Sequence, residues 1–187
     1  MKTAQERIDH AAYQLFSRYG TKSVGIDAVL ERAGVAKATL YRHYRTKDDL
    51  VLGFLKRREQ LWTKDWLAAE LERRGKTPAQ RLLAMFDVFD GWFRKADFEG
   101  CSFVNVMLEH VSSNHPVRQA AVRQLASIRE FIAALARQAG VRDAENFARQ
   151  WQIILKGAIV SAQQGDQDAA RRAKEVAAMF LTYKTAR

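Results

Sequence analysis

The chain has 187 residues, 48% of them hydrophobic, and carries a formal net charge of +10 at pH 7. This length and composition are enough for one or two small domains with a real core. The positive charge indicates a polyanionic partner, either nucleic acid or a membrane surface. The positive density is N-terminal, since residues 1–60 hold 12 Lys and Arg against 7 Asp and Glu.

Composition and apolar patterning exclude other classes of protein. Cys101 is the only cysteine, so no disulfide framework can form within the chain, as is typical of a reducing cytosol. The longest apolar run covers residues 131–136, far short of the roughly 20 residues that a membrane-spanning helix needs. Charged residues interrupt every apolar run near the N-terminus. We therefore expect no signal peptide, no membrane contact and a cytoplasmic location.

The first part of the chain predicts three short helices. Thr3 and Glu6 form a capping-box pattern that opens the first of them. A second helix is expected over residues 26–33 and ends at Gly34, and a third is expected over residues 37–44. These three helices alone offer too little apolar surface for an independent core. We therefore expect the following helix to contribute to both parts of the chain.

Longer helices are expected after Thr46. Thr46 is the expected cap of the next helix, with Asp48 and Asp49 in its first turn where acids suit the positive end of the helix dipole. Thr77, Pro78 and Gln80 mark another helix start, with a cap, a proline at the first position and a glutamine at the third. Strand-type alternation is hard to find, so the sequence predicts an all-α protein of about nine helices. The last six are expected over residues 47–73, from 78 to a break at Gly100, and over 102–112, 116–139, 143–164 and 167–185.

Residues 26–44 have the pattern of a helix-turn-helix. Gly34 lies between the two helices, where a tight turn needs a residue that tolerates positive φ. On the third helix, Leu40 and Tyr44 share the face that is expected to pack inward. The opposite face, its flanks and the start of the next helix then carry the candidate DNA-binding residues: Lys37, Ala38, Thr39, Tyr41, Arg42, His43 and Lys47.

This face has the chemistry to bind double-stranded DNA. A helix of this length spans about 12 Å, close to the width of a B-DNA major groove, which is about 12 Å. Arg42 can donate two hydrogen bonds to guanine O6 and N7, and the small Ala38 permits close approach. Tyr41, Thr39 and Lys47 can bind phosphate oxygens. Basic helical hairpins also occur as ordinary solvated surface, and geometry and charge alone leave that alternative open.

The stretch GIDAVLERAGVAKATLYRHYRTKDDLV resembles the DNA-binding segment of the tetracycline-repressor (TetR) family of bacterial transcription regulators. The resemblance lies in Ala-Gly-Val around the turn, in Thr-Leu-Tyr on the third helix, in the aromatic Tyr44 and in Lys47 followed by an acid and Leu50. Two positions depart from the family pattern. Gly25 stands where the family often has a threonine cap, and Leu30 where it often has a small residue.

The resemblance implies two domains and a function. Residues 1–46 would form an N-terminal three-helix, helix-turn-helix DNA-binding domain, and residues 47–187 a C-terminal helical ligand-binding and dimerisation domain. The last two helices would hold a homodimer, whose recognition helices, about 34–36 Å apart, read a palindromic operator. We therefore expect a repressor of transcription that responds to a small-molecule effector.

The resemblance also implies an effector pocket in the C-terminal part. The polar groups that could orient a ligand there are His110, or Asn105 with Glu109. Ordinary core packing is the alternative for each aromatic candidate. The candidate pocket residues are Trp62, Trp66, Phe86, Phe89, Trp92, Phe103, Met107, His110 and Trp151.

Other functions find less support in the sequence. Cys101 and His110 would lie about 13.5 Å apart along one helix, too far for a nucleophile and its base. The four histidines show no zinc-ligand spacing, so we expect no enzyme, no catalytic residue, no metal and no cofactor. Two alternatives remain: a redox-sensing regulator that uses Cys101, and a non-specific architectural DNA-binding protein. The DNA affinity of a specific regulator and of an architectural protein both fall as salt is raised. Only a specific regulator keeps a large ratio between its affinity for one sequence and its affinity for random DNA.

Overall fold

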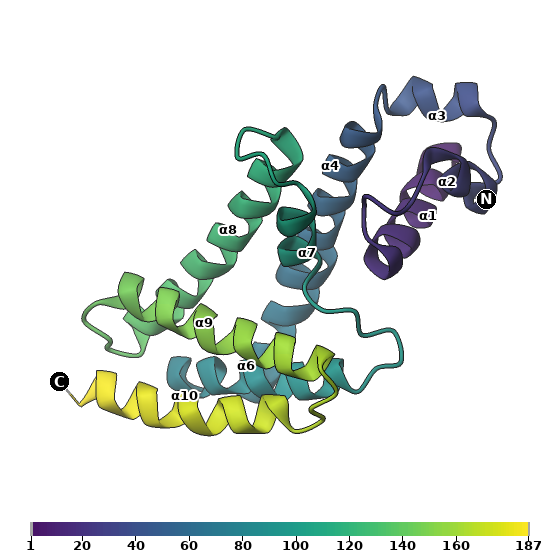
Figure 1. Cartoon of the computed structure of the whole chain (residues 1–187). Helices are drawn as coiled ribbons and strands as arrows, with labels where there is room; N and C mark the ends of the chain where they lie inside the picture. The colour runs from purple at the N-terminus through teal and green to yellow at the C-terminus, as the bar shows by residue number, and fades with distance from the viewer. Residues whose placement is uncertain (1, 187) are drawn as a thin grey trace. The chain divides into compact units, whose positions relative to one another are not determined.

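The computed structural model describes residues 2–186, and this part of the chain is all-helical, as the sequence predicts. Counted with the unbroken segment 47–74 as one helix, the described residues form nine helices (Figure 1). Their bounds are α1 Ala4–Tyr19, α2 Ile26–Ala33, α3 Lys37–His43, α4 Lys47–Arg58, η1 Glu59–Leu67, α5 Ala68–Arg74, α6 Pro78–Phe93, α7 Ser102–Glu109, α8 Pro116–Gln138, α9 Ala144–Gln163 and α10 Ala169–Thr185.

Three helices begin at the caps that the sequence predicts, and each cap is a reciprocal capping box. In α1, the Thr3 hydroxyl accepts the Glu6 N–H at 3.2 Å, and the Glu6 carboxylate accepts the Thr3 N–H at 2.7 Å. Each box satisfies N–H groups that have no partner within the helix. The same reciprocal pair opens α4 with Thr46 and Asp49, and α6 with Thr77 and Gln80.

The long segment after Thr46 differs from the single α-helix expected over residues 47–73. A π-helix, η1, stands between α4 and α5, and the helical segment ends at Arg74. It contains Trp62 and Trp66, whose ring centroids are 5.4 Å apart. An apolar pattern over so few residues does not distinguish i→i+5 from i→i+4 hydrogen bonding, so the sequence does not reveal the π-helix.

The end of α7 is also earlier than expected, at Glu109 instead of residue 112. The Arg118 guanidinium donates from Nη1 to the carbonyl oxygens of Met107, at 2.5 Å, and His110, at 3.2 Å. Because the last carbonyls of a helix lack donors within it, this arginine from α8 satisfies the end of α7. A pattern confined to residues 102–112 contains no sign of that partner.

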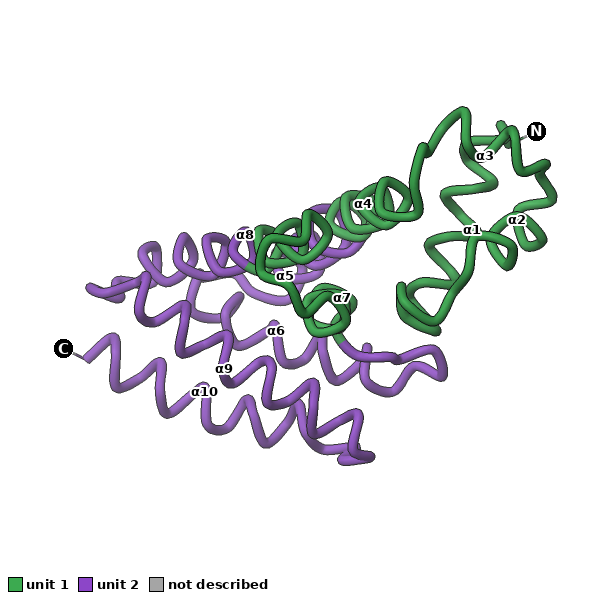
Figure 2. Tube along the Cα trace, turned by 45° about the horizontal axis from the view of Figure 1, so that its top comes forward, with its two compact units in different colours: residues 1–61, 101–125 green, residues 62–100, 126–187 purple. Residues whose placement is uncertain are grey.

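The chain packs as two compact units (Figure 2). Unit 1 consists of the residues up to Leu61 together with Cys101–Leu125. In it α1 packs against α2, α3 and α4. The side chains of Ile8, Leu40 and Leu50, from three of these helices, are at most 1% exposed and form its core. Unit 1 therefore combines the predicted DNA-binding helices with α4, α7 and the start of α8.

Unit 2 consists of Trp62–Gly100 and the residues from Ala126 onward. In it α10 packs against α6 and α9, and α5 packs against α6. The Phe147 ring stacks on Trp151 and on Phe180, with 5.0 Å between ring centroids in each pair, and the Trp151 and Phe180 centroids are 6.5 Å apart. Two of the three boundaries between the units fall within η1 and α8, and the third falls between Gly100 and Cys101, just before α7.

Candidate nucleic-acid interface

Gly34 forms the turn between α2 and α3. Its φ is +61°, in the left-handed region, and its N–H donates to the carbonyls of Leu30 at 2.9 Å and Glu31 at 3.2 Å. Residues with a Cβ rarely adopt this conformation, so the predicted glycine turn is confirmed. The Gly34 carbonyl accepts a hydrogen bond from Arg7 Nη1 at 3.2 Å, which ties the turn to α1.

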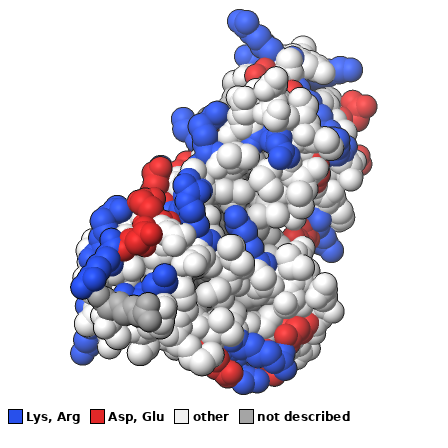
Figure 3. Space-filling model, turned by 60° about the vertical axis from the view of Figure 1, so that its left-hand side comes forward, with Lys and Arg blue, Asp and Glu red and all other residues white. Residues whose placement is uncertain are grey.

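The helix α3 has one buried and one exposed face. Leu40 is fully buried and Tyr44, at the C-cap, is half-buried, as the sequence predicts. In the space-filling view, Lys and Arg side chains lie at the top, where Figure 1 places α3 (Figure 3). Of the candidate residues on α3, Thr39 is partly exposed and the others are exposed: Lys37, Ala38, Tyr41, Arg42 and His43.

Arg42 is oriented by a neighbour on the same helix. Its Nη2 donates to the Thr39 hydroxyl at 3.2 Å, across one helical turn. A guanidinium has five N–H donors, so this bond leaves others to reach a base edge. Thr39 therefore helps to set the direction of the Arg42 side chain.

Lys47 lies at the start of α4, beside the loop that joins α1 to α2. Its Nζ donates to the carbonyl oxygen of Lys22 at 3.4 Å. Lys47 thus places an ammonium group next to the loop that leads into the helix-turn-helix.

The N-cap of α2 is Gly25, which makes no side-chain cap hydrogen bond. This departure from the family pattern therefore removes a hydroxyl from the start of the helix.

A carboxylate from the end of α7 fixes the same loop. Glu109 Oε2 accepts hydrogen bonds from the Thr21 N–H at 2.9 Å, the Lys22 N–H at 3.2 Å and the Thr21 hydroxyl. Gly20, with φ +80°, lies so close that a Cβ there would collide with the Glu109 carboxylate. We call these four residues the Glu109 clamp. The partners lie more than 80 positions apart in the sequence, so no local pattern indicates the clamp.

Two histidines lie next to the Glu109 clamp. His110 Nε2 lies 3.3 Å from the Thr21 hydroxyl, and the His110 and His115 ring centroids are 4.5 Å apart. His115 Nε2 is 3.5 Å from Asp48 Oδ2 at the start of α4. Burial, and then the nearby His115, lower the pKa of His110 below its ordinary value. The end of α7 therefore contacts both the α1–α2 loop and α4 within unit 1.

Comparison with known proteins identifies the family. Residues 8–53 match the family described as bacterial regulatory proteins, tetR family. Residues 78–177 match the tetracyclin repressor-like C-terminal domain. The chain belongs to the TetR family. It is therefore a transcriptional regulator with a helix-turn-helix DNA-binding domain, in a family of DNA-binding transcription factors and not of enzymes.

Relatives of this TetR-family regulator match most of its length. The HTH-type transcriptional regulator YjdC from Escherichia coli (strain K12) is 24% identical over 88% of this chain and 87% of its own. The structure of SCO4454, a TetR-family transcriptional regulator from Streptomyces coelicolor, superposes with a TM-score of 0.86 at 25% identity, over 97% of this chain and 96% of that one. A tetr-transcriptional regulator (sav143) from Streptomyces avermitilis gives a TM-score of 0.75 at 28% identity, over 89% and 90%.

The candidate pocket residues of the TetR-family regulator fall into three groups. Trp62, Trp66, Phe89 and Trp92 form one aromatic cluster in unit 2, where the Trp62 and Trp92 centroids are 5.0 Å apart. Phe86 and Trp151 form a second group there, with centroids 5.5 Å apart. The third group, Phe103, Met107 and His110, lies on or next to α7 in unit 1.

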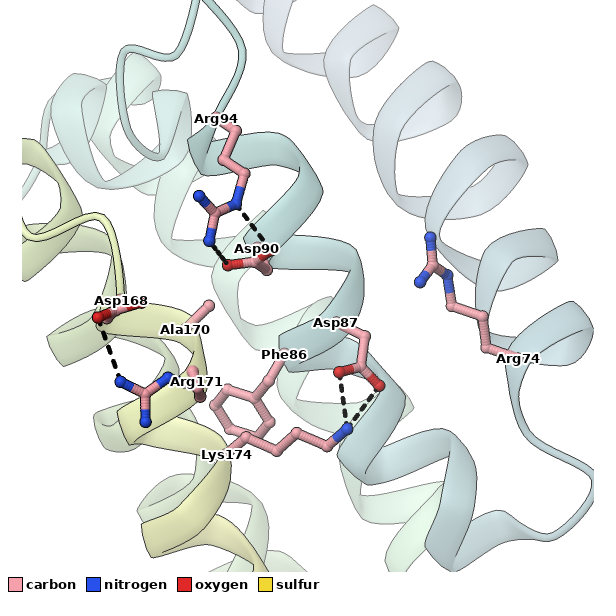
Figure 4. Close-up of a pocket in the computed structure, with 9 residues that line it drawn as sticks. All are labelled: Arg74, Phe86, Asp87, Asp90, Arg94, Asp168, Ala170, Arg171 and Lys174. Carbon is pink, nitrogen blue, oxygen red and sulfur yellow. Dashed lines mark hydrogen bonds and ion pairs between the residues drawn. The ribbon is translucent and has the colours of Figure 1, made fainter.

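Unit 2 also has a surface groove of about 460 Å³ between α5, α6 and α10 (Figure 4). Phe86 and Ala170 provide apolar lining, and seven charged side chains provide the rest. Lys174 reaches from α10 to Asp87 on α6, with Nζ at 2.6 and 2.7 Å from the two carboxylate oxygens. The groove is lined by Arg74, Phe86, Asp87, Asp90, Arg94, Asp168, Ala170, Arg171 and Lys174.

Neither a metal site nor a membrane span is found within residues 2–186. No group of three or more His, Cys, Asp and Glu side chains in this range is placed to hold a metal ion. None of the helices described there has both the length and the apolar composition to cross a bilayer.

Proposed function

We propose that this TetR-family regulator is a repressor that binds a palindromic operator as a homodimer and releases it when a small-molecule effector binds. The observation that carries the proposal is the exposed face of α3, with Arg42 oriented by Thr39 and anchored beneath by the buried Leu40. In the proposed complex this face enters the major groove, and Lys47 and Tyr41 bind the flanking phosphates. Residues 1–46 would form the DNA-binding domain, with Lys47 at the start of α4 adding a phosphate contact, and residues 47–187 would otherwise serve dimerisation and effector binding.

An exposed apolar surface on α9 and α10 supports the homodimer. On α9, Ile153 is 70% exposed and Val160 is 50% exposed, two turns apart on one side of the helix. On α10, Val176, Met179 and Tyr183 follow at intervals of three and four residues, which places them on one side of the helix, and they are 49–68% exposed. Each helix thus has exposed apolar side chains along one side, and exposed apolar surface marks an interaction site. We call these five residues the α9–α10 stripe.

The effector is expected to bind among the aromatic groups of unit 2. Trp62 and Trp66 are only partly buried, and both lie in a π-helix, a local distortion that is frequent at functional sites. Within the described residues, the buried Nε1 of Trp151 has no hydrogen-bond partner, although buried polar groups normally have one. A flat apolar effector would suit the Trp62 group, and one with an acceptor oxygen would suit the Trp151 group. It would cause release by binding more tightly to a form of the dimer with wrongly spaced recognition helices.

Selection of bound duplexes from a random pool tests the proposal. Purified full-length protein should enrich a two-fold symmetric sequence with half-sites about one helical turn apart. Affinity for the recovered duplex should exceed affinity for random DNA by a factor of about 10³ or more at physiological salt. Recovery of no common sequence, with equal binding to all duplexes, would show a non-specific architectural DNA-binding protein instead.

A further inference from the structure

A polar brace holds the C-terminal end of α3. The Tyr44 hydroxyl donates to Asp9 Oδ1 at 2.6 Å and accepts from Gln5 Nε2 at 2.8 Å. Gln5 Nε2 also donates to Asp9 Oδ1, at 2.9 Å, so the three side chains form a closed triangle. Gln5 and Asp9 lie one turn apart on α1. We call this triangle the Tyr44 brace.

A glycine on α4, Gly53, packs directly against the Tyr44 ring. A Cβ on Gly53 would lie 3.0 Å from the Tyr44 hydroxyl oxygen and 3.2 Å from ring carbon Cε1, closer than ordinary contact. Gly53 lies inside α4, where glycine destabilises a helix by about 1 kcal/mol relative to alanine. Its φ is not positive, so the turn chemistry that requires glycine elsewhere does not apply here. The close approach of the Tyr44 ring explains the glycine at this position.

The brace complements the apolar anchor of α3. Leu40, one turn earlier, is fully buried, but an apolar contact has no preferred direction and leaves some rotation of the helix about its axis. Hydrogen bonds do have a preferred direction, and a bond to a carboxylate is stronger than one between neutral groups. Burial and the hydrogen bond to Asp9 raise the pKa of Tyr44, so the hydroxyl stays protonated and remains a donor.

We propose, on the basis of operator reading by α3 as proposed above, that the Tyr44 brace positions the recognition helix for base readout. Tyr44, Asp9 and Gln5 act as positioning residues, because they fix the rotation of α3 about its own axis and do not themselves bind DNA. A small rotation moves Arg42 away from a base edge but leaves mobile side chains within reach of phosphates. Loss of the brace should therefore reduce discrimination between sequences more than it reduces binding.

The test compares two tyrosines that each lose one hydroxyl. Tyr44→Phe keeps the ring and removes the brace, whereas Tyr13→Phe removes a hydroxyl that bonds Arg58 Nη1 at 2.8 Å and joins α1 to α4. Affinities for the selected operator and for a random duplex are measured over a range of salt, together with unfolding by urea. We expect Y44F to lower the operator-to-random ratio about tenfold, the order of one lost base contact, with random binding within about twofold of wild type. Y13F should keep the wild-type ratio.

Further variants separate positioning from stability. Asp9→Asn keeps an acceptor for the Tyr44 hydroxyl and should restore most of the ratio that Asp9→Ala loses. Gly53→Ala crowds the ring with the tyrosine intact, so it tests the brace even if Y44F does not fold. Gly91→Ala is its control, because that helical glycine in α6 has open space around it. G53A should lower the ratio several-fold, and G91A should not.

The outcomes distinguish the brace from the proposed function. A wild-type protein with no preferred sequence overturns operator reading itself, and the positioning role with it. If the wild-type protein prefers one sequence, and Y44F and G53A keep its operator-to-random affinity ratio, only the role of the brace is overturned. Equal losses of ratio in Y44F and Y13F that follow the loss of stability would also overturn it, because they would show a general effect of weakened packing.

Discussion

Arg42 is the side chain on α3 best suited to read a base. Its Nη2 bond to the Thr39 hydroxyl directs the guanidinium along the exposed face, and a guanidinium can bond both acceptors of a guanine edge. Arg42→Ala should therefore relax base preference at one position of each half-site and cost about 1–3 kcal/mol of operator binding. Selection from a random pool with the variant measures the preference directly. An unchanged preference would exclude Arg42 from base readout.

Lys47 should behave differently, because it is expected to bind phosphate. Its ammonium group lies at the start of α4 and reaches the Lys22 carbonyl at 3.4 Å, a weak contact that a phosphate can replace. Lys47→Ala should weaken binding to all duplexes alike and reduce the slope of log K against log salt by about one. Titrations of operator and random DNA between low and high salt check this. A slope equal to that of wild type would place Lys47 away from the phosphates.

Much of the interface could be predicted at the residue scale, because its signals are local. Gly34, the capping pairs and the alternation of faces on α3 each depend on residues within one or two turns. The partners of Tyr44 and Glu109 could not be predicted in this way. The partners of Tyr44 lie 35 and 39 positions away and those of Glu109 more than 80, and a single sequence does not show which distant groups meet.

At the element scale, the Glu109 clamp links the end of α7 to the α1–α2 loop. Glu109→Ala removes three hydrogen bonds and leaves the Thr21 N–H without its partner, in a residue that is only 1% exposed. We expect a loss of about 1–3 kcal/mol in the free energy of unfolding of the protein, measured in urea. Glu145→Ala, which breaks an exposed pair with Arg137, should change it by at most about 1 kcal/mol. Equal effects of the two variants would mean that the clamp adds nothing beyond a surface ion pair.

The histidines next to the clamp predict a dependence on pH. Burial and His115 lower the pKa of His110 in the folded protein, while Asp48 and Glu109 oppose this less strongly. The unfolded chain then binds the proton more readily, so stability is lost as the pH falls through about 6.5. His110→Asn should flatten the change in the free energy of unfolding between pH 7.5 and pH 5.5. Parallel profiles for the variant and wild type would remove His110 from this dependence.

Helix ends could be predicted where the residues at the end are themselves typical of a helix start or stop. Residues 26–33 and the start at Pro78 agree with the structure because caps, glycines and proline mark them. The π-helix η1 and the early end of α7 were not predictable. The first depends on a change in helical pitch that leaves little trace in the apolar pattern, and the second depends on a guanidinium from α8.

At the scale of the whole molecule, the proposed dimer depends on the α9–α10 stripe. Met179 is 68% exposed on α10, so a charge there costs the monomer little but would be buried in a dimer. Met179→Glu should give a monomer by light scattering and reduce operator affinity by at least about tenfold. Val111→Glu is the control, since Val111 is an 82% exposed apolar residue outside the stripe. A dimeric M179E protein with wild-type affinity would place the interface elsewhere.

The α9–α10 stripe has a consequence for how such regulators diverge. In a two-fold pair each residue of the stripe is present twice, once on either side of the axis. A single codon change therefore alters two places in the interface at once, and its energetic effect is roughly doubled. Two gene copies that begin identical can in this way stop pairing with each other after very few substitutions, while each still pairs with itself.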